Sequence, residues 1–194
     1  HDISIESIRF LPNVKDSLFV GIEDGNTMLQ VVVPGNDGMR DEYLNDGEQK
    51  IINNEYFTFN NAKDGAINFY MEGDWIKCNS PYNVSTMSMI TRDIRNYDTS
   101  NPFVVQKKTL HTANGLNFVF KDVFRNSKLL PVSTSNVMVD GSEDALILNV
   151  KANGESKEVV LYGGKGYSGT DKVFAIKDLN FKLSYGSKYY NVPF

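Results

Sequence analysis

The sequence predicts an all-β fold, a mostly antiparallel two-sheet sandwich or barrel-like domain with little helix. Apolar and polar residues alternate along many short segments, as they do in strands with one buried face. Turn-forming residues, with Asn-Gly and Asp-Gly among them, interrupt these segments at short intervals, which is typical of antiparallel sheet. Helical spacing of apolar residues is scarce, and only 39–44 is expected to form one or two helical turns.

The first two thirds of the chain supply most of the predicted strands. Segment 1–10 alternates isoleucine and phenylalanine with polar residues and is expected to be a strand. A hairpin is predicted next, with 17–23 paired to 27–33 around Asp24-Gly25-Asn26, because asparagine and glycine tolerate the positive φ of a tight turn. The following β-rich segments are also expected to be strands: 56–59, 66–71, 84–91, 103–110 and 116–120.

The C-terminal third contains the clearest hairpin signal. Segments 145–151 and 157–162 flank Asn153-Gly154, and both central residues of a type I′ turn need positive φ. The last strands are expected at 173–176, 180–185 and 188–192. No repeat or low-complexity linker divides the sequence, so residues 1–194 are predicted to form a single domain.

Composition bounds the function. The chain of 194 residues is 41% hydrophobic and 23% charged, which is enough for a core without a metal or disulfides. Its net charge of -4 does not favour nucleic acid as a partner. No run of eighteen apolar residues is present, and both ends are strand-like. The expectation is a soluble domain excised from between transmembrane segments.

Candidate reactive residues are few. Cys78 is the sole cysteine, which excludes an intrachain disulfide and an all-cysteine zinc site. It is a candidate thiol, or else a small buried side chain of the core. His1 and His111 are the two histidines, and no orienting acid or amide is marked near Cys78 and His111 for a catalytic dyad. No catalytic residue or metal ligand is therefore assigned, and cofactor-binding residues stay unknown.

Three other clusters have both a functional and a structural interpretation. Glycine-rich 163–169 lacks the Lys-Ser/Thr and helix of a phosphate loop, so a flexible turn between strands is expected. The acidic cluster Asp140, Glu143 and Asp144 lacks the ligand spacing of a calcium loop and is expected to be a solvated turn. Aromatic residues near the C-terminus either line a ligand surface or pack in a sheet: Tyr185, Tyr189 and Tyr190.

Two stretches of the sequence carry a family resemblance. The first is 72–93, which begins Glu-Gly-Asp-Trp-Ile-Lys-Cys-Asn-Ser-Pro. The second starts at Asp144, includes Leu-Tyr-Gly-Gly-Lys-Gly-Tyr-Ser-Gly at 161–169, and ends with Leu-Ser-Tyr-Gly-Ser-Lys-Tyr-Tyr-Asn-Val-Pro-Phe at 183–194. Together they resemble the extracytoplasmic domain of ResB-like cytochrome c biogenesis proteins, especially the forms fused to a CcsA-like half.

The resemblance implies a location and partners. In that family, transmembrane helices flank a large domain on the periplasmic side of the membrane, and the parent complex attaches haem to apocytochrome c as a haem lyase or synthase. This chain is then expected to contact apocytochrome c and the CcsA-like haem-handling half. The family's haem-ligating histidines and tryptophan-rich haem motif lie outside the matching stretches, so no cofactor is expected to bind this fragment and it is expected to be non-catalytic alone.

Two other classes of function remain open on the sequence. One is a carbohydrate-binding or adhesive β-sandwich module of a surface protein, which requires exposed aromatic side chains in a groove. The other is a hydrolase whose carboxylates assemble in space, which requires a deep acidic cleft.

Overall fold

The computed structural model describes residues 2–99, 101–137, 139–166 and 168–187, which form strands and turns without a helix. The prediction of an all-β, mostly antiparallel fold is confirmed. The described residues divide into two compact units: a split unit from 1–18 and 129–194, and an inserted unit from 19–128. The prediction that residues 1–194 form one domain stays a prediction.

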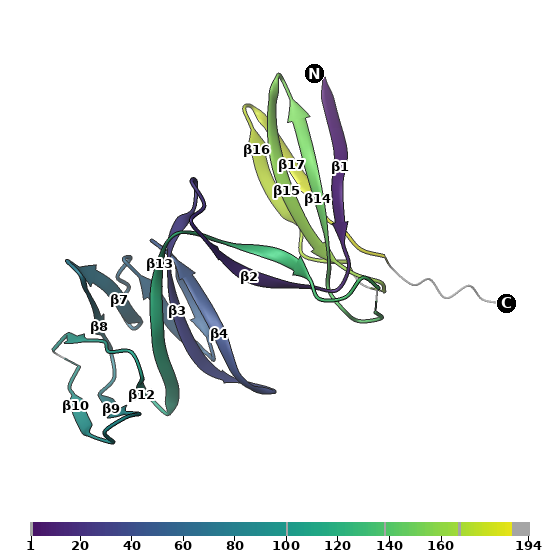
Figure 1. The fold of residues 1–194 in the computed structure, drawn as a ribbon. Coiled ribbons are helices and arrows are strands. Elements are labelled where there is room, and N and C mark those ends of the chain that lie inside the picture. The colour runs from purple at the N-terminus through teal and green to yellow at the C-terminus, as the bar shows by residue number, and fades with distance from the viewer. Residues whose placement is uncertain (1, 100, 138, 167, 188–194) are drawn as a thin grey trace. The chain divides into compact units, whose positions relative to one another are not determined.

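The split unit is built on an antiparallel sheet with the strand order β1-β14-β15 (Figure 1). These strands are β1 (Ile3–Leu11), β14 (Asp144–Ala152) and β15 (Glu155–Gly163). Asn153 and Gly154 join β14 to β15 with φ angles of 50° and 79°, so the predicted Asn-Gly hairpin is confirmed.

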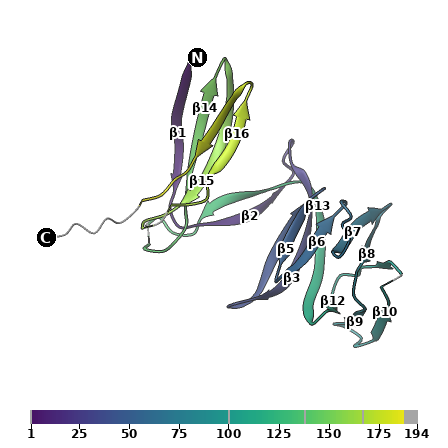
Figure 2. The same cartoon turned by 180° about the vertical axis from the view of Figure 1, so that it is seen from behind.

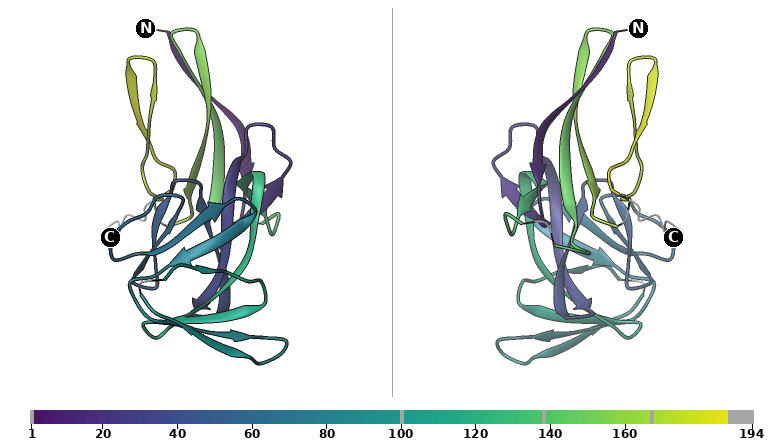
Figure 3. Two further views of the ribbon diagram at one scale, coloured as in Figure 1. Left: turned by 90° about the vertical axis from the view of Figure 1, so that its left-hand side faces the viewer. Right: turned by 90° about the vertical axis from the view of Figure 1, so that its right-hand side faces the viewer.

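A second hairpin covers part of this sheet. It consists of β16 (Lys172–Ile176) and β17 (Leu179–Leu183), lies on one face of the sheet in Figures 1 and 2, and is seen as a separate hairpin in Figure 3. Phe174 and Phe181 of the hairpin stack with 5.3 Å between ring centroids. The buried core of the split unit comprises Leu148, Val150, Ala152, Val159, Leu161, Phe174 and Ile176.

Two further sheets lie mainly in the inserted unit, although two strand ends, 14–18 and 129–133, belong to the split unit. Within the described residues, the larger sheet has the order β10-β9-β12-β13-β3-β4, with β2 also paired to β13, and the smaller has the order β11-β8-β7-β6-β5. The pairing of β6 with β7 is parallel. The strands of the larger sheet are β2 (Val14–Val20), β3 (Asn26–Gly35), β4 (Gly38–Asn45), β9 (Val84–Ser88), β10 (Ile94–Tyr97), β12 (Thr109–Ala113) and β13 (Leu116–Ser133). Those of the smaller sheet are β5 (Gln49–Ile52), β6 (Glu55–Phe59), β7 (Ile67–Glu72), β8 (Trp75–Asn79) and β11 (Phe103–Val104).

Aromatic side chains join the two sheets of the inserted unit. Phe118 of β13 packs edge-to-face on Phe57 of β6 and on Phe69 of β7, with centroid distances of 5.6 and 5.9 Å. All three rings are fully buried. Burial of such rings is the largest hydrophobic contribution that single side chains make to a core, so this cluster defines the centre of the inserted unit.

The hairpin predicted for 17–33 is wrong in its pairing. A turn does exist there, because the Gly25 amide donates to the Ile22 carbonyl at 2.9 Å. However, β2 pairs with β13, and β3 pairs with β13 and β4. A Cβ on Gly25 would collide with the backbone of Asn126 and Ser127, so the turn is pressed against β13. A strand of 18 residues offers partners for both segments, which the local turn signal does not reveal.

Three other predictions need correction or lie outside the described residues. Segment 39–44 is part of strand β4 and not a helix, because it pairs with β3 along its length. Segment 103–110 is divided between β11 and β12, which belong to different sheets. The strand predicted at 188–192 lies outside the described residues.

Candidate functional site

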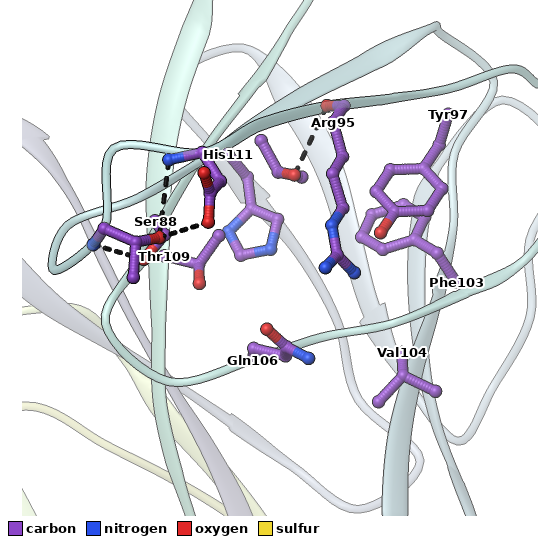
Figure 4. A pocket seen from close by; sticks show the side chains of 11 residues that line it. Ser88, Arg95, Tyr97, Phe103, Val104, Gln106, Thr109 and His111 are labelled. Carbon is purple, nitrogen blue, oxygen red and sulfur yellow. Dashed lines mark hydrogen bonds between the residues drawn. The ribbon is translucent and has the colours of Figure 1, made fainter.

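A pocket of about 230 Å³ lies in the inserted unit among β9, β10, β11 and β12 (Figure 4). Strand pairing explains how residues distant in sequence meet there. β12 lies between β9 and β13, so that His111 is opposite Thr86 on one side and Phe118 on the other. The pocket is lined by Thr86, Ser88, Thr91, Asp93, Arg95, Tyr97, Phe103, Val104, Gln106, Thr109 and His111.

His111 is the most unusual residue of this pocket. Its side chain is 1% exposed and its Nδ1 atom has no hydrogen-bond partner among the described residues. The ring stacks on Phe118 with 5.0 Å between centroids and faces Phe103 at 6.0 Å. An unpaired polar atom in such a place costs about 1–3 kcal/mol, so it calls for a partner such as a ligand or water.

The environment of His111 also determines its charge. Burial lowers its pKa to about 4, and the backbone groups of Phe118 and Thr109 act in the opposite direction but less strongly. The imidazole is therefore neutral at pH 7, with one nitrogen donating and the other accepting. In the sequence, His111 stands out only as a possible partner for Cys78. The alternation of Thr109, His111 and Ala113 along a strand was the signal that all three face the core.

The rim of the pocket is held by a hydrogen-bonded turn. Ser88 Oγ accepts from the amide of Thr91 at 3.1 Å, and Thr91 Oγ1 donates to Asp93 Oδ2 at 2.6 Å. Thr86 Oγ1 donates to the carbonyl oxygen of Arg95 at 3.3 Å. The turn therefore fixes the start of β10, from which the Arg95 side chain extends over the pocket (Figure 4).

Cys78 lies in β8 and is fully buried in the core of the inserted unit. Its sheet neighbours are Phe69 on one side and Phe103 on the other. Burial raises the pKa of the thiol well above its usual range, so the nucleophilic thiolate is disfavoured. No hydrogen bond joins Cys78 to His111 among the described residues. Of the two interpretations of Cys78, the structure favours the small core side chain.

The glycine-rich turn packs against the segment that follows β17. A Cβ on Gly163 would collide with the carbonyl group of Tyr185, and one on Gly169 with the carbonyl group of Tyr162. The amide of Gly169 donates to the Tyr185 carbonyl at 2.9 Å, and the amide of Ser187 to the Gly164 carbonyl at 3.2 Å. The glycines therefore permit close backbone contact. The turn is bonded to the segment after β17, whereas the sequence suggested a flexible turn.

The three candidate tyrosines have different outcomes. The ring of Tyr185 packs on the core of the split unit and meets Phe10 edge-to-face, with 6.2 Å between centroids. Tyr189 and Tyr190 lie outside the described residues.

The sequence suggested that the acidic cluster Asp140, Glu143 and Asp144 forms one solvated turn, and the structure differs. Asp140 is exposed and pairs with Lys165, but Asp144 is buried and its Oδ1 accepts from the amide of Asn13 at 2.7 Å. Asp144 was misassigned because its partner lies 131 residues away in sequence.

A second acidic group shares a pocket of about 440 Å³ with Tyr162 in the split unit. Burial and the Asp16 carboxylate raise the pKa of Glu143. Asp16 Oδ1 already accepts from the Tyr162 hydroxyl at 2.7 Å, and Asp171 pairs with Lys182. Asp16 and Asp171 are thus engaged by other side chains. No group of three or more His, Cys, Asp or Glu among the described residues is placed to hold a metal ion.

A groove of about 460 Å³ lies beside the first pocket in the inserted unit. Trp75, which belongs to the first resemblance stretch, lines it and is 64% exposed. Lys107 and Asp122 form an ion pair of 2.5 Å at the groove. Val104 and Gln106 line both the groove and the first pocket.

Comparison with known proteins adds no assignment. No family model, no curated protein and no solved structure matches the chain. The part of the chain that the structure describes contains no apolar helix of membrane-spanning length.

Proposed function

We propose that this chain is the extracytoplasmic domain of a ResB-like c-type cytochrome assembly protein. In this role it positions unfolded apocytochrome c, or supports the CcsA-like haem-presenting half, on the periplasmic side of the membrane. The haem is handled by the parent complex and not by this chain.

The packing of the resemblance stretches supports the proposal. Residues 161–169 and 183–187 are separated in sequence, yet they bond to one another through Gly169 and Tyr185 and through Gly164 and Ser187. Gly163 and Gly169 are required sterically at this contact. The glycines of the second resemblance stretch are thus residues that this contact needs.

The observation that carries the proposal is the exposed edge strand β1. It is the outermost strand in the order β1-β14-β15, and eight of its nine residues are exposed. Among the described residues no strand pairs with its outer edge, so its backbone amides and carbonyls are available to an extended chain that adds by main-chain hydrogen bonds. Such bonds do not depend on the side chains of the partner, which suits a domain that receives unfolded apocytochromes.

The apolar face of β1 adds to this edge. Ile3, Ile5 and Phe10, which we call the β1 apolar row, lie opposite Ala152, Val150 and Leu146 of β14. Directly paired residues share a face, so the row extends the face that carries the core of the split unit. The β16–β17 hairpin covers that face at β14 and β15, whereas Ile3 and Ile5 are 51% and 50% exposed. An extended peptide at the edge would cover these side chains.

The test is binding of a fluorescently labelled apocytochrome c peptide that contains the paired cysteines, measured by anisotropy with and without haem. Saturable binding without haem is expected, and Ile5→Lys should weaken it at least tenfold because a charge replaces an apolar contact. A peptide with serine in place of both cysteines should bind equally well, because the Cys78 thiol is buried. Val173→Lys is the matched control, since Val173 is an exposed apolar residue of another strand in the same unit.

Absence of saturable binding, or equal loss in both lysine variants, would contradict the proposal that β1 receives the peptide. Circular dichroism of each variant would show whether the sheet is intact.

A second candidate function has one observation in its favour. The exposed indole of Trp75 lies at a groove with the polar groups of Gln106 and Asp122, an arrangement that suits stacking of a sugar ring. A carbohydrate-binding surface module would show a saturable change in Trp75 fluorescence with oligosaccharides. This tryptophan is the sole one in the chain, so the signal has one source.

A further inference from the structure

The pocket around His111 contains hydrogen-bonding groups that the described residues leave unused. The guanidinium of Arg95 and the amide of Gln106 form no hydrogen bond or ion pair with a described residue. The Nδ1 atom of His111 is likewise without a partner. In Figure 4 the Arg95 and Gln106 side chains extend into the pocket beside the His111 ring. The guanidinium of Arg95 offers donors only, and the amide of Gln106 offers two more, so the matching ligand presents acceptors to them.

The charges at the pocket select the kind of acceptor. Arg95 and Asp93 are the charged residues among those that line it. The Asp93 carboxylate is held in the rim turn by Thr91, at 2.6 Å from the threonine hydroxyl. One cation with one nearby anion suits a monoanion better than a multiply charged group such as phosphate. The planar fork of a guanidinium matches the two oxygens of a carboxylate.

The wall of the pocket selects the rest of the ligand. Tyr97 stacks on Phe103 with 4.3 Å between centroids and 16° between planes, and Phe103 in turn faces His111 at 22°. These stacked rings form a largely apolar wall next to the polar groups. A cavity of about 230 Å³ is smaller than typical drug-sized sites, so the body of the ligand is small.

We propose that this pocket binds a small organic monocarboxylate. The carboxylate pairs with Arg95 and Gln106, the apolar body of the ligand lies against Tyr97 and Phe103, and its far end contacts the His111 ring. This inference goes beyond the proposed role in cytochrome assembly and stands whether or not that role is correct, since it rests on residues far in sequence from β1.

The experiment is an NMR titration of the whole 194-residue chain, labelled with ¹⁵N, with sodium benzoate as the probe. The His111 ring signals, assigned by their absence in His111→Phe, should shift saturably together with the Tyr97 and Phe103 amides. Benzamide, which has the same shape without the charge, should bind at least tenfold more weakly. Inorganic phosphate should cause no saturable shift at these residues.

Two arginine variants separate the pocket from general surface charge. Arg95→Gln should weaken benzoate binding at least tenfold, while Arg92→Gln removes the same charge three residues away and should bind as the unaltered chain does, because Arg92 does not line the pocket. Both side chains are exposed, so neither change should unfold the protein. The amide spectrum of each variant would reveal any unfolding. Absence of a saturable benzoate shift, equal binding of benzamide or phosphate, or equal effects of the two variants would overturn the proposal.

Discussion

Acidification should destabilise this protein through His111 in particular. In an unfolded chain the pKa of histidine is about 6.5, whereas burial lowers that of His111 to about 4 in the folded state. Between these values the unfolded state binds a proton that the folded state does not, so the free energy of unfolding falls as the pH falls. The stabilisation that His111 gives the folded state by staying neutral is fully present above pH 6.5 and is lost progressively toward pH 4. The two pKa values give a loss of about 2.5 kcal/mol at pH 4.5.

The perturbation that isolates this effect is His111→Phe. A phenyl ring keeps a flat side chain between Phe103 and Phe118 but cannot titrate. Urea unfolding followed by circular dichroism, at half-unit steps from pH 8 to pH 4.5 in carboxylate-free buffers, gives the free energy of unfolding of both proteins. Exposed acids such as Asp24 and Asp171 titrate alike in both and cancel in the difference.

The expected outcome is a difference between the two proteins that changes by about 2.5 kcal/mol in favour of the variant on going from pH 8 to pH 4.5. If the two curves run parallel across this range, then the imidazole is not held neutral by burial and the reasoning about its environment is refuted.

Two further outcomes test the packing. Gly169→Ala should lower the free energy of unfolding by about 3 kcal/mol, because the added Cβ meets the Tyr162 backbone. Gly154→Ala should lower it by only about 1 kcal/mol, because the one cost is the left-handed φ of that residue. Equal stability of the two variants in urea unfolding would argue against the glycine contact. Cys78 should not react with a thiol reagent at pH 8 until urea unfolds the chain, because it is fully buried; rapid reaction of the native protein, measured by absorbance, would disprove that burial.

The parts of the fold that the sequence predicted are those determined locally. The β14–β15 hairpin follows from Asn153-Gly154, since two residues set both the turn and the register of the strands beside it. The pairing of 17–33 could not be obtained in this way, because β13 competes for both β2 and β3 from a hundred residues downstream. Local turn chemistry fixes where a chain reverses, but not which strand it pairs with next.

The candidate site was less predictable for the same reason. The pocket brings together Arg95 of β10 and His111 of β12, two strands of one sheet that are both neighbours of β9. Gln106 reaches the same pocket from the segment after β11, which belongs to the other sheet. No spacing in the sequence marks that meeting. Cys78 attracted attention as the sole cysteine, yet its strand neighbours Phe69 and Phe103 enclose it. Residue type alone identified a potentially reactive group, whereas burial removed its reactivity.

The insertion of 19–128 between the two parts of the split unit has a consequence for the order of folding. The inserted unit is continuous in sequence, so it can fold as soon as its own residues emerge during synthesis. β1 cannot pair until β14 arrives, since Ile3 is matched with Ala152, and closing so large a loop is slow. During this interval the β1 apolar row is exposed without a sheet, and a chaperone that shields the first ten residues should therefore raise the yield of native protein.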